Sequence, residues 1–158
     1  MLLLTDGLVL LALALLLGHH VLCAKMVDAV SRGDLGAVRR IVAVYPRSAN
    51  AASSEAFGEF KEPALSIAIL NGDEKIAALL IRKGADPNAR DYLAKTPLHY
   101  ALELGQGDVV RLLLDHNADP RAEDCVGKTP IYYGDATNPG GERAIRIFLQ
   151  HRRTRGGK

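Results

Sequence analysis

The sequence contains no tryptophan and only two cysteines, Cys23 and Cys125, and aromatic residues make up 5% of its 158 residues. Two cysteines exclude a disulfide scaffold and a zinc site with four cysteine ligands. So few aromatic side chains argue against a platform on which nucleic-acid bases stack. The formal net charge of +2 is too small to predict nucleic-acid binding. The hydrophobic fraction of 48% and the charged fraction of 24% are those of a globular domain.

The first 24 residues contain no Lys or Arg, and residues 8–17 form an unbroken apolar run. This run is too short for a membrane-spanning helix, which needs about 20 apolar residues, but it has the length of the hydrophobic part of a secretory signal. Small or apolar residues follow it up to Ala24. We therefore expect residues 1–24 to be a signal peptide that is removed after Ala24 or after Cys23, and the protein to be secreted or periplasmic.

The charges around this segment leave two alternatives open. Asp6 offsets the positive terminal amine, and the first basic residues, Lys25 and Arg32, come after the apolar run. Positive charge in that position resists export of the chain that follows. In the first alternative the segment is a short, uncleaved membrane anchor. In the second, translation starts at Met26, the upstream residues are an artefact, and the protein is cytoplasmic.

A period of 33 residues organises the rest of the chain. Three segments recur 33 positions later: 79–81 as 112–114, 85–87 as 118–120, and 95–97 as 128–130. A fourth pair, 65–69 and 98–102, lines up at the same shift. Because four landmarks share one period, the sequence predicts a row of similar structural units.

Residues 96–105 have the pattern of a short helix with signals at both ends. Thr96 can cap the N-terminus with its side chain, and Pro97 suits the first turn. Gly105 can end the helix because glycine adopts a left-handed conformation without strain. Between these ends, apolar residues three and four positions apart form one stripe, at Leu98, Ala101 and Leu102.

A second helix is predicted from about Asp108, and its apolar face consists of Val109, Leu112 and Leu113. Asn117 ends it, as Gly84 ends the corresponding helix one period earlier, because both residue types tolerate a left-handed conformation. The polar stretch that follows contains Gly127 and predicts a tight turn. Neither helix can bury its stripe alone, so the units are expected to stack on one another.

The segments Thr96-Pro-Leu-His-Tyr-Ala101, Asp108-Val-Val-Arg-Leu-Leu-Leu114 and Ala118-Asp-Pro120, with Gly105 between the first two, resemble an ankyrin repeat. The resemblance covers residues 25–153. It implies an all-α solenoid of about four helix-turn-helix units with short β-hairpin turns. The units are expected at about 26–57, 63–95, 96–128 and 129–152, with an insertion at about 53–61 and a basic tail at 154–158.

Several positions depart from the family pattern. In the second unit Pro63 and Ala64 replace the Thr-Pro pair, and Ser66 replaces the histidine. The fourth unit has Gly134 where alanine is expected. Ala94 occupies the place of Gly127, where the family keeps glycine because the hairpin requires a positive φ. We therefore expect Ala94 to be strained by about 1–2 kcal/mol.

The residues that could carry catalysis have a simpler interpretation. The resemblance implies that His99 forms hydrogen bonds within the opening turn of its unit and links neighbouring units. Cys125 has neither a helix N-terminus nor a neighbouring histidine in the sequence to activate its thiol. His19 and His20 have no cysteine or acid close by to complete a metal site. We expect no enzyme, no metal and no cofactor.

Binding of another protein is the function that the resemblance implies, and the sequence does not identify that protein. We expect a monomer that does not bind nucleic acid and that meets a membrane only if the N-terminal segment is uncleaved. In ankyrin proteins the contacts come from the hairpin tips and the exposed side of the first helices. On this chain those positions are Arg90, Tyr92, Leu93, Lys95, Glu103, Leu104, Glu123, Cys125, Val126 and Lys128. Tyr92, Leu93 and Leu104 are expected to form an exposed apolar cluster.

Overall fold

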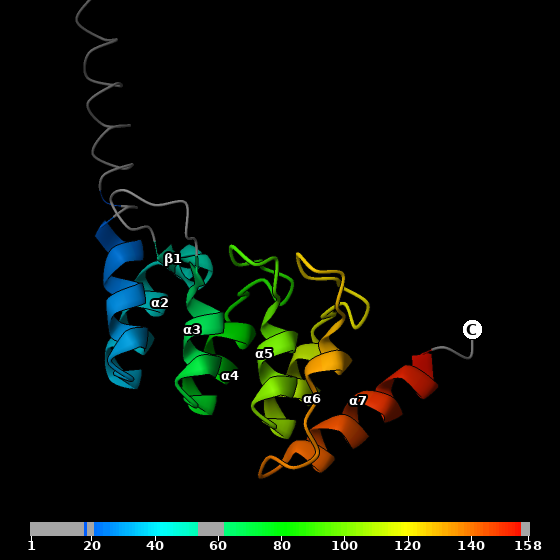
Figure 1. The fold of residues 1–158 in the computed structure, drawn as a ribbon. Coiled ribbons are helices and arrows are strands. Elements are labelled where there is room, and N and C mark those ends of the chain that lie inside the picture. Colours follow the sequence, from blue (N-terminus) through cyan, green and yellow to red (C-terminus); the bar gives the residue numbers. More distant parts are fainter. Residues whose placement is uncertain (1–17, 19–20, 54–61, 156–158) are drawn as a thin grey trace, which may run out of the picture.

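The computed structural model describes residue 18, residues 21–53 and residues 62–155, which form a row of stacked helix pairs (Figure 1). The helices of the described ranges are residues 21–31, α2 (Leu35–Val44), α3 (Ala64–Leu70), α4 (Glu74–Arg82), α5 (Pro97–Glu103), α6 (Gly107–Asp115) and α7 (Gly141–Arg155). Two 3₁₀ helices add η1 (Pro46–Asn50) and η2 (Pro130–Tyr133). The predicted all-α stack of repeat units is confirmed.

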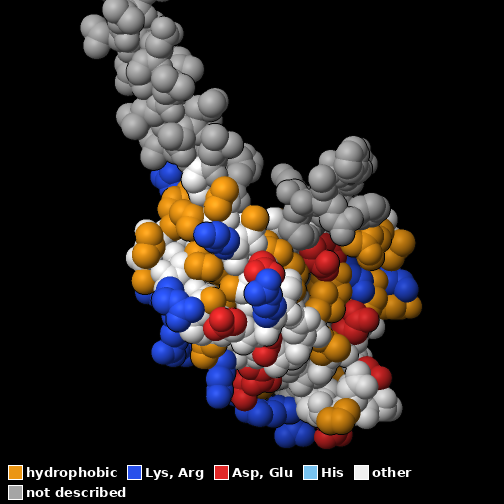
Figure 2. All heavy atoms as spheres, turned by 90° about the vertical axis from the view of Figure 1, so that its left-hand side faces the viewer, with side chains coloured by type: hydrophobic (Ala, Val, Ile, Leu, Met, Phe, Trp, Pro, Cys, Tyr) orange, Lys and Arg blue, Asp and Glu red, His pale blue; other side chains and the backbone are white. Residues whose placement is uncertain are grey.

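The helices form two layers. In one layer α3 packs on α5 and α5 packs on η2, and in the other α2, α4, α6 and α7 pack in that order. Within each unit the first helix packs on the second, as α3 does on α4 and α5 on α6. The buried hydrophobic residues of all units join into one core that runs from Met26 to Phe148. Figure 2 faces the N-terminal end of this row. Basic and hydrophobic side chains lie along its left edge, and basic and acidic side chains lie together along its lower edge.

The predicted apolar stripes point into this core. Leu98, Ala101 and Leu102 on α5 are completely buried. On α6, Val109 and Leu113 are buried as predicted, whereas Leu112 is only half-buried on the outer side.

The chain reversals take the predicted left-handed conformations. Gly105, Gly84 and Asn117 end their helices with φ of 67°, 87° and 66°. Ala94 has φ of 57° and Gly127 has φ of 75°, so both hairpins keep the same geometry. The prediction that Ala94 adopts a positive φ is therefore confirmed.

The turns differ from the expected β-hairpins in one respect. Within the described ranges, strands occur only at β1 (Ala52–Ser53) and β2 (Glu62–Pro63), which pair antiparallel. The turns at residues 91–95 and 124–128 reverse the chain without a strand ladder (Figure 1). We call them hairpin 91–95 and hairpin 124–128. Residues 54–61 of the expected insertion lie outside the described residues.

The fourth unit departs most from the predicted pattern. Its first helix is the short η2, and the chain leaves it in an extended conformation at Gly134. A Cβ atom at Gly134 would lie 3.0 Å from Cγ1 of Ile145, which explains why alanine does not stand there. The basic tail was expected to begin at residue 154. Instead, the second helix of this unit, α7, begins at Gly141 and continues to Arg155, so residues 154 and 155 are helical rather than part of a tail.

The N-terminal helix crosses the predicted cleavage points. Residues 21–31 are helical without interruption, and Cys23 packs against the core. The fully buried residues of this helix begin at Met26 and continue with Ala29 and Val30. Among the described residues, no helix combines the length and the hydrophobicity needed to cross a bilayer.

Candidate functional site

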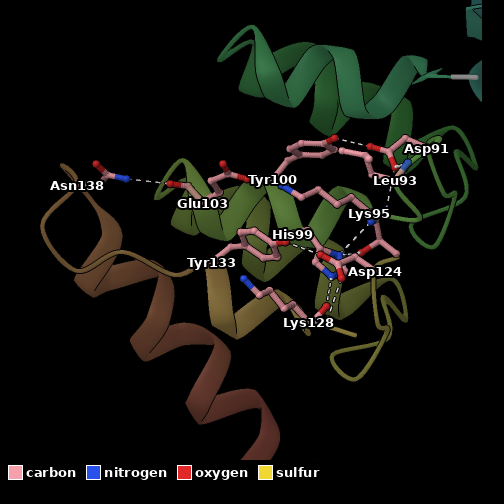
Figure 3. A network of polar contacts seen from close by, with 11 residues as sticks. Asp91, Leu93, Lys95, His99, Tyr100, Glu103, Asp124, Lys128, Tyr133 and Asn138 are labelled. Atoms are coloured by element: carbon pink, nitrogen blue, oxygen red, sulfur yellow. Dashed lines mark hydrogen bonds and ion pairs between the residues drawn. The ribbon is translucent and has the colours of Figure 1, made fainter. Parts of the chain in front are cut away.

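Two buried aspartates shape the hairpins. Oδ1 of Asp91 accepts hydrogen bonds from the backbone N–H groups of Leu93 and Lys95, at 2.8 and 2.9 Å. Its Oδ2 accepts a hydrogen bond from the hydroxyl of Tyr100 on α5 (Figure 3). Because one carboxylate holds both the turn and the next helix, the tip of hairpin 91–95 has a fixed position relative to the stack.

The same arrangement recurs 33 residues later. Asp124 accepts from the backbone N–H groups of Val126 and Lys128, both at 2.9 Å, and from the hydroxyl of Tyr133. Burial alone would raise the pKa of Asp124, but the hydrogen bonds from Tyr133, Lys128 and Val126 outweigh it and lower the pKa to about 2. The hydrogen bond between Tyr133 and Asp124 also raises the pKa of Tyr133, to about 12. Burial, together with Asp91, raises the pKa of Tyr100.

His99 joins the third unit to the following hairpin. The backbone N–H of Thr96 donates to Nδ1 of His99 at 3.0 Å, so this nitrogen carries no proton. Nε2 therefore carries the proton and donates to the carbonyl oxygen of Lys128, at 3.1 Å. Burial lowers the pKa of His99, which favours this neutral form. The geometry gives His99 the predicted structural role within the opening turn and between units.

Lys95 is enclosed by the third and fourth units. Its Nζ lies 3.0 Å from Oε2 of Glu103, 4.1 Å from the centre of the Tyr133 ring and 5.1 Å from that of Tyr100. Only 12% of its side chain is exposed. Because the ammonium already faces a carboxylate and two aromatic rings, Lys95 and Glu103 stabilise the packing of the units on each other.

The two hairpins lie side by side. The backbone N–H of Cys125 donates to the carbonyl oxygen of Leu93 at 2.9 Å, and Nη1 of Arg90 donates to the carbonyl oxygen of Glu123 at 2.7 Å. Five exposed apolar side chains belong to these hairpins and to the neighbouring η2, and we call them the tip patch: Tyr92, Leu93, Cys125, Val126 and Tyr132. The exposed fractions of Tyr92, Val126 and Tyr132 are 54%, 65% and 63%.

A family model described as ankyrin repeats, in three copies, matches residues 26–124, which is more than half of the chain. The chain belongs to the ankyrin-repeat family. No curated protein matches it. Ankyrin repeats are generally protein–protein interaction modules and are typically not catalytic. The fourth unit lies beyond the matched residues.

The ten positions expected to meet a partner fall into distinct environments in this ankyrin-repeat stack. Tyr92, Leu93, Cys125 and Val126 belong to the tip patch, and the exposed Arg90 and Glu123 flank it. Lys128 is half-buried, and its Nζ lies 3.9 Å from the centre of the Tyr132 ring. Lys95 and Glu103 pair with each other, as described above.

Leu104 is 40% exposed but lies at the opposite end of α5 from the hairpins. The seven residues of α5 separate it from the hairpin end by about 10 Å of helix. The structure therefore does not bring Leu104 together with Tyr92 and Leu93 at the tips, as the sequence led us to expect.

Tyr132 is the member of the tip patch that was not among the ten expected positions. It stands 33 positions after His99, in a unit that lacks the histidine. A tyrosine has no ring nitrogen to accept the N–H of Thr129, so Tyr132 cannot form the hydrogen bond that holds His99, and its ring lies beside Nζ of Lys128 instead. The missing histidine does not by itself predict this exposure, because Ser66 also replaces the histidine and is completely buried.

No cluster of possible metal ligands is seen in the described residues. In this part of the chain, no three side chains of His, Cys, Asp or Glu lie close enough together to hold a metal ion. Cys125 is exposed, and His99 is held by Thr96 and Lys128.

Proposed function

We propose that this ankyrin-repeat protein is a binding module that holds a partner protein against the tip patch. The observation that carries the proposal is the exposure of five apolar side chains on two adjacent, internally braced hairpins and on η2. Exposed apolar side chains that gather at one place are typical of interaction sites.

The braced hairpins favour tight binding. Asp91 and Asp124 each accept two backbone N–H groups and a tyrosine hydroxyl. A surface that is already ordered loses less conformational entropy on binding.

The composition of the patch also fits a protein partner. Tyr92 and Tyr132 are tyrosines, a residue type enriched among the residues that dominate binding energy. Arg90 and Glu123, which are exposed and precede the two hairpins, add polar groups of both charges at the edge of the patch. A partner surface with complementary apolar side chains and both signs of charge at its edge would match this arrangement.

The proposal is tested by a comparative capture experiment in the native host. The full chain is the bait, beside a tip variant with Tyr92→Ser, Val126→Ser and Tyr132→Ser. A control variant carries Val44→Ser, Leu70→Ser and Leu149→Ser, three other exposed apolar side chains. Proteins that the wild type and the control retain and the tip variant loses support the proposal. A tip variant that captures the same proteins as the wild type contradicts it.

An enzymatic function is the alternative class, and the structure gives it little support, since His99 already serves the packing of the units. A hydrolase or transferase activity that His99→Gln abolishes without unfolding the protein would overturn the binding-module proposal.

We further propose that the chain is exported and loses residues 1–24. Support comes from the apolar run at 8–17 and from the core, whose fully buried residues begin at Met26. Cleavage after Ala24 would shorten the N-terminal helix and remove Cys23, which packs against the core, but would keep the buried residues from Met26 onward. Intact mass of the protein from its host decides the question: a mature N-terminus at Ala24 or Lys25 supports export. A chain starting at Met26, or the full chain in the membrane fraction, contradicts it.

A further inference from the structure

A groove separate from the tip patch lies on the layer that contains α2, α4 and α6. It has a volume of about 400 Å³ and crosses three units, because its walls come from α2, α4 and α6. Its apolar lining consists of Leu35, Ala78, Val109 and Leu112. Leu35, Ala78 and Leu112 are half-buried, so solvent reaches this lining.

Three cations surround the apolar lining. Arg39 comes from α2, and Lys75 and Arg82 come from α4. All three side chains are exposed. Among the residues that the structure describes, none of the three forms an ion pair. Their charges are therefore available to a ligand in the groove.

The carboxylates of the groove do not balance these cations. Asp108 is already paired, because its Oδ1 lies 2.6 Å from Nη2 of Arg143. That leaves Glu74 as the remaining carboxylate among the groove residues. With Arg143 included, four cationic side chains face two carboxylates, so the groove has an excess of positive charge around an apolar floor.

We propose that this groove binds an acidic, amphipathic segment of a partner protein, with its apolar side chains on Leu35, Ala78 and Leu112 and its carboxylates beside Arg39, Lys75 and Arg82. Charge complementarity selects an acidic ligand. The apolar lining selects a peptide rather than a nucleic acid, whose phosphates would leave that lining exposed and would meet Glu74. The inference does not depend on the tip patch.

The test selects peptides from a displayed library of random 12-residue sequences on the full wild-type chain. Affinities of the selected peptides are then measured by fluorescence anisotropy. The groove variant carries Arg39→Gln, Lys75→Gln and Arg82→Gln. Its matched control carries Arg40→Gln, Lys83→Gln and Arg111→Gln, which remove three exposed cations of the same helices or their caps outside the groove. Circular dichroism and thermal melts verify that both variants are folded.

The expected peptides combine several Asp or Glu residues with apolar residues. Their affinity should fall about tenfold or more in the groove variant, since each exposed ion pair contributes modestly and three are lost. It should change by less than about twofold in the matched control and in the tip variant, and it should fall as salt rises.

Five results would overturn the inference. Peptides that bind the groove variant and the wild type equally would place the site elsewhere, as would sensitivity to the tip variant alone. Enrichment of peptides without acidic residues would exclude the charge argument. A single-stranded oligonucleotide that displaces the peptides and binds more tightly would make the ligand a nucleic acid. A wild-type dimer that the groove variant converts to a monomer would make the occupant a second copy of this chain.

Discussion

Nε2 of His99 lies 3.1 Å from the carbonyl oxygen of Lys128, so one imidazole ties the third unit to the hairpin that leads into the fourth. The other ring nitrogen accepts the backbone N–H of Thr96. The contact with Thr96 requires the neutral ring, because a protonated Nδ1 could no longer accept, whereas the Nε2–H group can donate to Lys128 in either state.

Protonation of His99 should weaken the fold. Burial lowers the pKa of His99 in the folded protein. The contribution of neutral His99 to the free energy of unfolding is therefore fully present above the unfolded pKa of about 6.5, and it is lost as the pH falls through the pKa of the folded protein. His99→Gln removes this titration and leaves at least one buried partner unpaired, which costs about 1–3 kcal/mol at neutral pH. Urea melts from pH 8 to pH 5 should show a steeper loss of stability in the wild type than in the variant. If the stability of both proteins fell equally with pH, the neutral His99 ring would not be what holds Thr96 and Lys128 together.

The Asp124–Tyr133 contact predicts a dependence on acid pH. The pKa of Asp124 is lowered to about 2 in the folded protein, against about 3.9 in the unfolded chain. Its contribution is therefore present above about pH 4 and is lost as pH falls towards 2. Asp124→Asn should be less stable than the wild type at neutral pH and should lose less stability between pH 4 and pH 2. Denaturant melts at these pH values check this prediction. An equal loss of stability in both proteins between pH 4 and pH 2 would contradict it.

The same contact predicts a dependence on alkaline pH. The pKa of Tyr133 is raised to about 12 in the folded protein, against about 10 in the unfolded chain. The contribution of its hydrogen bond to the free energy of unfolding is therefore lost as the pH rises from about 10 to about 12. Tyr133→Phe should make the loss of stability in this range shallower, because the phenol that titrates is gone. Thermal melts of both proteins between pH 9 and pH 12 measure the difference; an unchanged alkaline limb would contradict the prediction.

The two hairpins allow a paired test of backbone strain. Ala94 and Gly127 stand at equivalent positions with φ of 57° and 75°, and a Cβ at Gly127 would meet nothing within 4 Å. Relief of strain, less the extra freedom that glycine gives the unfolded chain, should make Ala94→Gly more stable by up to about 1 kcal/mol. Gly127→Ala should be less stable by about the same amount. Denaturant melts decide, and a destabilised Ala94→Gly protein would show that strain does not govern this turn.

Ser66 stands where the third unit has His99, and its buried hydroxyl has no hydrogen-bond partner among the described residues. An apolar replacement removes the cost of burying that hydroxyl, so Ser66→Ala should raise the free energy of unfolding by about 1 kcal/mol. Ser48 is the matched control, because it is equally buried but its hydroxyl donates to the carbonyl oxygen of Tyr45 at 2.5 Å. Ser48→Ala should lower stability. Thermal melts in which both variants shift in the same direction would contradict this account.

The repeat could be predicted from the sequence because its signals are local. The period of 33 and the conformations of Gly105 and Asn117 depend on residues within one unit, and the structure has them as expected. The fourth unit could not be predicted in the same way. The short η2 and the early start of α7 depend on contacts between units, such as the hydrogen bond from Nδ2 of Asn138 to the carbonyl oxygen of Glu103 at 2.9 Å.

In the candidate site, too, features set within one repeat unit could be predicted, and features set by contacts between units could not. The hairpin positions of Tyr92 and Val126 followed from their place in the repeat. Lys95 was predicted to meet a partner but faces Tyr133 of the next unit, a contact that only the stacked structure reveals. Leu104 was exposed as expected, yet its distance from the tips depends on the direction of α5.

The central claim is that the tip patch binds a partner protein, and a binding constant tests it most directly. Calorimetric titration would compare the wild type, the tip variant and the control with Val44→Ser, Leu70→Ser and Leu149→Ser, each against the protein recovered by capture. Loss of a dominant contact residue costs at least about 2 kcal/mol, so the tip variant should bind at least about 30-fold more weakly while the control binds like the wild type. A tip variant with unchanged helicity and an unchanged Kd would contradict the claim.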